Sequence, residues 1–204
     1  MIPDGASLMI GGFMAVGSPV RIIDEIVRQN KRNLTVIAND SAAPGLGIGH
    51  LIAAKLVSKL IASHIGLNPE TQRQMLNDEM EVELVPQGTL VERIRAGGSD
   101  LGGVLTRTGV GTSVEPGKPH VEIAGVTYLV ETALRADFAL IQAFLADHMG
   151  NLSYALTARN FNPVMAMGAH TVIACADNVV PVGVIPPDHV ITPAPLVDYL
   201  IGNP

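Results

Sequence analysis

Short apolar runs alternate with segments of helical periodicity along most of the chain. In a parallel sheet each strand is buried on both faces and reads as a short apolar run, and a helix usually connects it to the next strand. The pattern therefore predicts an α/β fold with an open, mainly parallel sheet flanked by helices. The predicted strands are Ser7 to Gly12, Leu34 to Asn39, Val57 to His64, Val82 to Gln87, Asp137 to Ala143 and Thr171 to Ala176.

Three helices are predicted between these runs. Two of the starts combine a residue that can cap N-terminal amides with a proline in the first turn, and apolar residues then recur at helical spacing. The third helix ends at a pair of glycines, which often terminate helices. The predicted helices are residues 19–29, beginning at Ser18-Pro19; residues 69–78, beginning at Asn68-Pro69; and Thr89 to Ala96, ending at Gly97-Gly98.

One stretch departs from the alternating pattern. Gly98 to Gly117 is rich in Gly, Thr and Ser without helical period, which predicts a long ordered loop near a site. His120 to Val130 alternates around Ala124-Gly125 and predicts a small β-hairpin inserted on the sheet. The chain contains no internal repeat and no linker, so we expect a single domain over residues 1–204.

Composition narrows the class of protein. Of the 204 residues, 48% are apolar and 16% are charged, against about 25% charged in an average soluble domain. This predicts a large core and buried interfaces. No apolar run is long enough to span a bilayer, and residues 1–19 lack the basic start of a signal peptide, so a cytoplasmic protein is expected.

Charge and cysteine content exclude further classes. The net charge is −6 and the basic residues form no stripe, which argues against nucleic acid as a partner. The single cysteine, Cys175, permits no intrachain disulfide and lies in an apolar run that predicts a core position. Because the chain has no Cys-x-x-Cys and no His-x-x-x-His spacing, no metal site is expected.

A glycine-containing loop follows the first predicted strand and precedes the first predicted helix. Its glycines would let backbone amides approach a ligand, and the helix start would favour a phosphate or an oxyanion. The alternative is a tight strand-to-helix turn. The chain carries neither the dinucleotide fingerprint nor the phosphate-loop motif. The candidate ligand-binding residues are Gly11, Gly12, Phe13, Met14, Ala15, Val16 and Gly17.

Polar residues at strand ends are the other candidates. Gln87 ends a predicted strand, where open parallel sheets bind ligands, and its amide would donate to a developing oxyanion unless it serves only the turn. Asn39 and Asp40 close the second strand and fit either a site or an Asx turn. Arg159 would pair with a carboxylate or fix a helix start and a subunit contact. Neither Ser-x-x-Lys nor Gly-x-Ser-x-Gly occurs, so the sequence offers oxyanion donors without a nucleophile.

The segment Asp4 to Pro19 resembles the signature of the alpha subunit of family I CoA-transferases, of the acetate or butyrate:acetoacetate type. The resemblance covers almost the whole chain and implies a CoA-transferase or ribose-phosphate-isomerase-like fold. The other matching motifs are Ile37 to Asp40, Val85 to Leu90, Arg93 to Gly98, Thr108 to Thr112 and Thr157 to Asn162.

The resemblance also implies a division of labour between two subunits. In this family a glutamate of the beta subunit attacks the acyl-CoA thioester, and CoA is then held as a glutamyl thioester. Coenzyme A is a substrate, no cofactor is permanently bound, and the partner forms a hetero-oligomer, α2β2 or a multiple. The residue matching Gln87 helps to form the oxyanion hole, the loop matching Gly11 to Gly17 binds CoA, and Phe13 and Asn39 fall at the substrate pocket by position.

Three points stay open at this level. The acid pair is short-chain acids or, alternatively, a 3-oxoacid such as 3-oxoadipate or succinate as partner acid, and a non-catalytic acyl-CoA or sugar-phosphate sensor is a third reading. Arg107 stands where the family commonly has proline, and we hypothesise that it tunes acid specificity. Only three residues precede Asp4, whereas the family usually has more, so an amino-terminal helix is expected to be missing.

Overall fold

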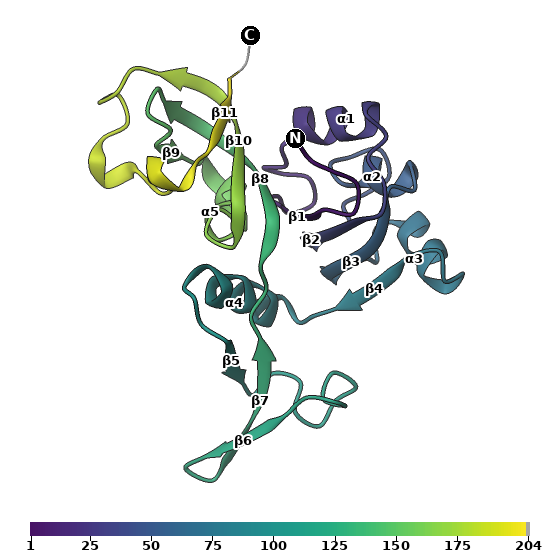
Figure 1. Ribbon diagram of the computed structural model, residues 1–204. Helices are drawn as coiled ribbons and strands as arrows, with labels where there is room; N and C mark the ends of the chain where they lie inside the picture. The colour runs from purple at the N-terminus through teal and green to yellow at the C-terminus, as the bar shows by residue number, and fades with distance from the viewer. Residues whose placement is uncertain (203–204) are drawn as a thin grey trace.

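The computed structural model describes residues 1–202, and a mainly parallel sheet forms its centre (Figure 1). The strand order is β11-β10-β8-β1-β2-β3-β4, all parallel, and β9 pairs with β8 in the antiparallel sense. This confirms the predicted fold class. The strands are β1 (Ser7–Ile10), β2 (Leu34–Asp40), β3 (Val57–His64), β4 (Glu81–Leu84), β8 (Ala136–Asp147), β9 (Leu152–Ser153), β10 (Ala169–Val180) and β11 (Tyr199–Ile201).

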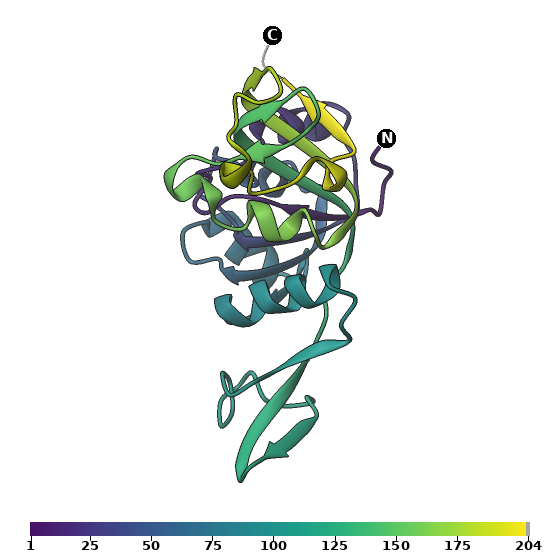
Figure 2. The same ribbon diagram turned by 90° about the vertical axis from the view of Figure 1, so that its left-hand side faces the viewer.

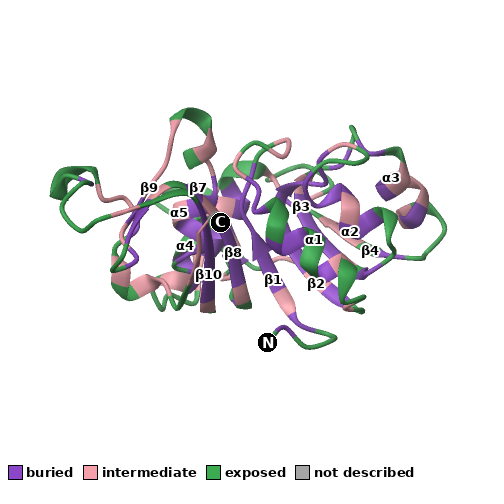
Figure 3. Cartoon of the chain, turned by 90° about the horizontal axis from the view of Figure 1, so that it is seen from above, coloured by how far each residue is buried: buried purple, intermediate pink, exposed green. Residues whose placement is uncertain are grey.

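Helices cover both faces of this sheet. Leu8 and Ile10 of β1 pack in one cluster with Ile23, whereas Met9 between them packs in a second cluster with Ile94. Both faces are therefore apolar, which explains why the strands read as continuous apolar runs. Figure 3 shows β1, β8 and β10 as mostly buried. The first face carries α1 (Val20–Arg28), α2 (Gly49–Ala53) and α3 (Pro69–Leu76), and the second carries α4 (Gln87–Gly98) and α5 (Asn162–Met165).

Helix starts decide where two candidate residues lie. The Asn68 side chain accepts a hydrogen bond from the Thr71 amide at 3.4 Å, so this cap of α3 is confirmed. The predicted cap of α1 is wrong, because the helix begins at Val20 and no side chain caps it. Helix α4 begins at Gln87 rather than at Thr89. The glutamine therefore occupies the first position of a helix instead of the end of a strand.

A second, antiparallel sheet projects from the main body, and β7 continues directly into β8 (Figures 1 and 2). Its order is β5-β7-β6, with β5 (Gly103–Thr106), β6 (His120–Ile123) and β7 (Val126–Thr132). The predicted hairpin is confirmed, and Ala124 and Gly125 at its turn have φ of 52° and 75°. The expectation of an irregular loop throughout 98–117 is wrong over β5, which pairs with β7.

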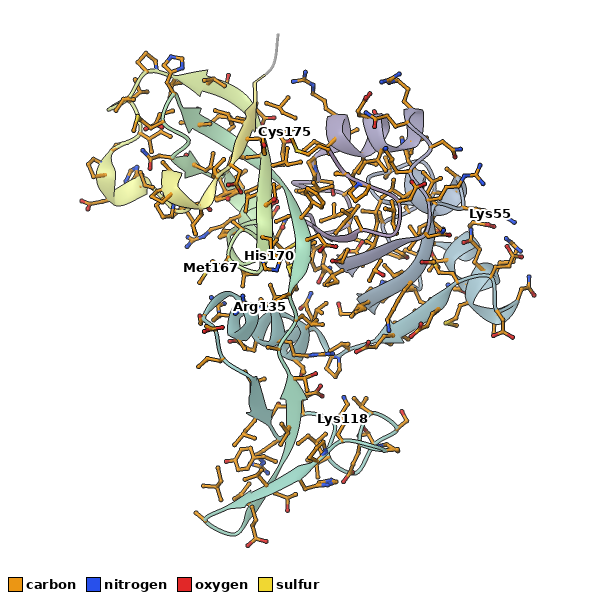
Figure 4. All side chains as sticks on the ribbon, viewed as in Figure 1. Lys55, Lys118, Arg135, Met167, His170 and Cys175 are labelled. Carbon is orange, nitrogen blue, oxygen red and sulfur yellow. The ribbon has the colours of Figure 1, made fainter. Side chains whose placement is uncertain are left out.

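Three short 3-10 helices complete the described chain: η1 (Leu156–Arg159), η2 (Pro187–His189) and η3 (Ala194–Leu196). Within residues 1–202, no helix combines the length and the apolar character needed to cross a bilayer. Cys175 on β10 is 2% exposed and belongs to the first apolar cluster, as predicted (Figure 4). Burial raises the pKa of its thiol, which keeps the sulfur protonated and unreactive.

Candidate active site

A cavity of about 350 Å³ lies at the carboxyl-terminal ends of β2 and β3 and beside the start of α4. This is the edge at which open parallel sheets bind ligands. It brings together three predicted residues, Phe13, Asn39 and Gln87, from segments far apart in the sequence. The cavity is lined by Phe13, Met14, Asn39, Asp40, Ser63, His64, Leu67 and Gln87.

A chain of hydrogen bonds orients the Gln87 side chain. Gln87 Nε2 donates to Asn39 Oδ1 at 2.5 Å, and Asn39 Nδ2 donates to Asp40 Oδ2 at 2.6 Å. Asn39 is only 2% exposed, so its amide is committed to these neighbours. The amide of Gln87 is exposed and has two N–H donors, which leaves one of them for a ligand in the cavity.

Asp40 is the carboxylate in the lining of this cavity, and its oxygens are occupied. Besides Asn39, the amides of Met14 and Ala42 donate to it at 2.9 and 2.7 Å. The bond from the Ala42 amide is the Asx turn weighed from the sequence. Because Asp40 is 6% exposed and accepts three hydrogen bonds, it is poorly placed to attack a substrate. Its role is to hold Asn39 and the neighbouring loop.

Residues 11–17, named here the hairpin loop, form a tight reversal between β1 and α1. The Phe13 amide donates to the Val16 carbonyl at 3.0 Å, and the Val16 amide donates back to the Phe13 carbonyl at 2.9 Å. Between them, Met14 and Ala15 have φ of 50° and 68°, as a two-residue type I′ turn requires. Non-glycine residues at positive φ cost about 1–3 kcal/mol each, so surrounding contacts must hold this turn.

The glycines of the hairpin loop are packed inside the protein. The Gly11 amide donates to the Leu140 carbonyl at 2.9 Å, and the Gly12 amide donates to Asn160 Oδ1 at 3.2 Å. The expectation that these two amides face a ligand is therefore wrong. A Cβ on Gly11 would lie 1.8 Å from Asn162 Oδ1, so glycine is needed here for close packing.

Other candidates lie away from the cavity. Gly17 lines a different cavity of about 350 Å³ that also includes Gln142, Phe144 and Cys175. Arg107 lies beside the small sheet, in a cavity shared with Val126. Within this chain, the structure therefore does not bring Arg107 next to Gln87. Arg159 ends η1, beside the asparagine that contacts the hairpin loop, and is exposed.

Three lining residues were missed in the sequence: Ser63, His64 and Leu67. The signal that would have found the first two is the one used for Asn39, because both end a predicted strand at the same edge of the sheet. Ser63 Oγ donates to the Asn39 carbonyl at 2.6 Å, which supports the second strand at the cavity. The exposed His64 adds a titratable group to the wall.

The start of α4 gives the cavity an electropositive side. Pro86 precedes the helix and offers no capping side chain, and the amide nitrogens of the first turn carry the positive end of a 12-residue helix. Together with the Gln87 amide, this arrangement favours negative charge developing on a ligand oxygen. Within residues 1–202, no three His, Cys, Asp or Glu side chains gather as a metal site would require.

Comparison with known proteins is consistent with this geometry. The family model described as Coenzyme A transferase matches residues 1–203. Acetate CoA-transferase subunit alpha of Escherichia coli is 52% identical over 97% of this chain and 90% of its own length. The acetoacetyl-CoA:acetate/butyrate CoA transferase alpha subunit of Clostridium acetobutylicum is 52% identical over 98% of this chain and 92% of its own length.

A solved structure shares the fold. An acyl-CoA transferase apoenzyme from Escherichia coli O157:H7 superposes with a TM-score of 0.85 at 24% sequence identity. The match covers 100% of this chain and 45% of that one, so this chain corresponds to less than half of the longer protein. The sequence match over nearly the full length, joined to the same fold, shows that this chain belongs to the coenzyme A transferase family.

Proposed function

We propose that this chain is the alpha subunit of a short-chain acyl-CoA:carboxylate CoA-transferase. It would exchange CoA between acetyl-, butyryl- or acetoacetyl-CoA and acetate or acetoacetate, with coenzyme A as a substrate and no resident cofactor. The observation that carries the proposal is the cavity itself, where Gln87 offers an oriented donor while the carboxylate of Asp40 is occupied. The names of the Escherichia coli and Clostridium acetobutylicum relatives agree with it.

In this proposal the nucleophile comes from a beta subunit. A glutamate carboxylate of that subunit attacks the thioester carbonyl, whose electron pair moves onto its oxygen, and Gln87 Nε2 donates to that oxygen. Collapse of the adduct expels the CoA thiolate and leaves an acyl-glutamyl anhydride. The thiolate then attacks the glutamyl carbonyl, which releases the first acid and forms a glutamyl-CoA thioester. The second acid collects CoA by the same steps in reverse.

The other lining residues divide into orienting and packing roles. Asn39 holds the Gln87 amide through its Oδ1, as the hydrogen-bond chain requires. Phe13 offers an apolar wall for a short acyl chain and is 46% exposed. The hairpin loop, from Gly11 to Gly17, is proposed to border the CoA moiety, with the side chains of Phe13 and Met14 rather than the glycine amides facing the cavity.

The proposed assembly is a cytoplasmic hetero-oligomer, α2β2 or a multiple of it. Exposed apolar side chains surround the cavity, among them Phe13, Val16 and Leu67, which are 46%, 49% and 49% exposed. Covering them with a partner would remove apolar surface from water and exclude water from the reaction. The chain alone is expected to be inactive.

Trapping of the covalent intermediate tests this division of labour. The chain is co-expressed with the beta subunit encoded by the neighbouring reading frame, incubated with acetoacetyl-CoA and reduced with borohydride. Because only the partner supplies a free carboxylate, the reduced glutamyl residue is expected on a partner peptide, identified by mass spectrometry, and this chain should remain unmodified. A thioester trapped on this chain would contradict the proposal.

The acid pair is tested by profiling the reconstituted enzyme. Acetate, butyrate and acetoacetate are expected to give higher kcat/KM values than succinate or 3-oxoadipate, because the described lining of the cavity contains no Lys or Arg that would pair with a second carboxylate. A preference for the dicarboxylic acids would move the chain to the 3-oxoacid CoA-transferases. Binding of acyl-CoA without any transfer would instead favour a sensing module.

A further inference from the structure

Two asparagines from the carboxyl-terminal part of the chain contact the hairpin loop. Asn160 follows η1 and Asn162 begins α5, so both lie about 145 positions after the loop that they touch. They come from the half of the sheet formed by β8 and β10, whereas the cavity lies over β2 and β3. The two halves of the fold therefore meet at the hairpin loop.

The Asn160 amide joins the two strands of the hairpin loop. Its Oδ1 accepts the Gly12 amide at 3.2 Å, and its Nδ2 donates to the Val16 carbonyl at 2.9 Å. The same amide is fixed in turn by the Phe161 amide, which donates to Oδ1 at 2.6 Å, and by the Thr157 carbonyl, which accepts from Nδ2 at 2.9 Å. One side chain thus bridges the start and the end of the reversal.

Asn162 secures the exit of the loop. Its Nδ2 donates to the Gly17 carbonyl at 3.0 Å and to the Ala158 carbonyl at 2.8 Å. Its Oδ1 accepts the Gln142 amide of β8 at 3.0 Å. The side chain is 0% exposed and packs directly on Gly11, so it cannot leave this position without disturbing β1.

The polar atoms of both asparagines are used within the protein, so neither side chain is available to bind a ligand. The loop that they hold contains Met14 and Ala15 at positive φ, a conformation that relaxes unless its surroundings maintain it. Asp40 holds the tip from the opposite side through the Met14 amide. The loop is consequently fixed at its tip and at both of its ends.

We infer that Asn160 and Asn162 are positioning residues that keep the hairpin loop in the conformation that presents Phe13 and Met14 to the cavity. That this conformation serves acyl-CoA binding rests on the proposed function. The positioning itself does not, because it concerns hydrogen bonds inside this chain. The two statements therefore call for separate measurements.

Hydrogen exchange measures the positioning without any activity. In the full chain, Asn160→Ala and Asn162→Ala are each expected to raise the amide exchange rate of a peptide covering residues 11–18 by at least about tenfold. Asn160→Asp keeps the acceptor for Gly12 and loses the donor for Val16, so an intermediate rate is expected. The matched control is Asn151→Ala, which removes bonds to Asp147 and to the Ala194 amide and touches no part of the hairpin loop.

Kinetics of the reconstituted pair measures the consequence. Both alanine variants are expected to lower kcat/KM for acyl-CoA by at least about tenfold, mainly through KM, because a small misplacement of a binding element has a large effect. Asn151→Ala should stay within about twofold of the wild type. Unchanged exchange over residues 11–18, or an equal increase in the control, would overturn the inference. A wild-type pair without transferase activity would refute the proposed function and leave the exchange result to decide the positioning.

Discussion

Replacing Gln87 by alanine is expected to lower kcat of the reconstituted pair by at least about tenfold while the two subunits still assemble. Removal of one oxyanion donor costs about 2.7–4 kcal/mol of transition-state stabilisation, which corresponds to about 10²–10³ in kcat. Tenfold is the lower bound because the amides at the start of α4 remain beside the cavity. The side chain is exposed and makes its hydrogen bond to Asn39 alone among the described contacts, so its loss should leave folding intact.

The measurement compares steady-state turnover with size-exclusion chromatography of the same samples. Gln87→Glu serves as a second variant, since it keeps the length of the side chain and replaces the donor by an acceptor, and its turnover should fall at least as far. Gln29→Ala is the matched control, because Gln29 is an exposed glutamine on the far side of α1 that bonds only Glu25 through its side chain in the described structure. Turnover at the wild-type level in Gln87→Ala would remove this residue from the site.

The strands of the sheet core were readable from the sequence because they are buried on both faces. Leu8 and Met9 point to opposite apolar clusters, so the run needs no polar alternation to be recognised. The order of the strands was not readable, since β1 pairs with β8 across about 130 positions. Strand β5 was missed because Gly103 and its glycine-rich flanks carry no alternating signal, and its structure depends on pairing with β7.

The candidate site was predicted in outline by one rule and one resemblance. Asn39 and Gln87 follow successive strands at the same edge, and the structure brings them within hydrogen-bond distance. The assignment of the Gly12 amide failed because its acceptor, Asn160, lies 148 positions away. Local sequence shows that a glycine permits a close approach, but it does not show whether a ligand or another part of the chain makes that approach.

Gly11→Ala is expected to lower the free energy of unfolding by about 3 kcal/mol or more. The new Cβ would lie 1.8 Å from Asn162 Oδ1 and 2.6 Å from its Cγ, and overpacking of this kind costs about 1–3 kcal/mol. Moving Asn162 aside would also leave the Gln142 amide and the Gly17 carbonyl without their partner, at about 1–3 kcal/mol for each buried group. For a chain of 204 residues this corresponds to a melting temperature lower by about 6–12 °C, measured by calorimetry.

A double-mutant cycle separates this clash from a general effect of substitution in β1. Asn162→Ala removes the atoms that the new Cβ would meet, so Gly11→Ala should cost less in that background, with a coupling of about 1–3 kcal/mol. Gly102→Ala is the control, because a Cβ there meets no atom within 4 Å, and its effect should stay within about 0.5 kcal/mol. Additive effects of the two substitutions would contradict the direct contact. A positive coupling would show that the glycine and the asparagine act as one packed unit, since each residue leaves the space that the other needs.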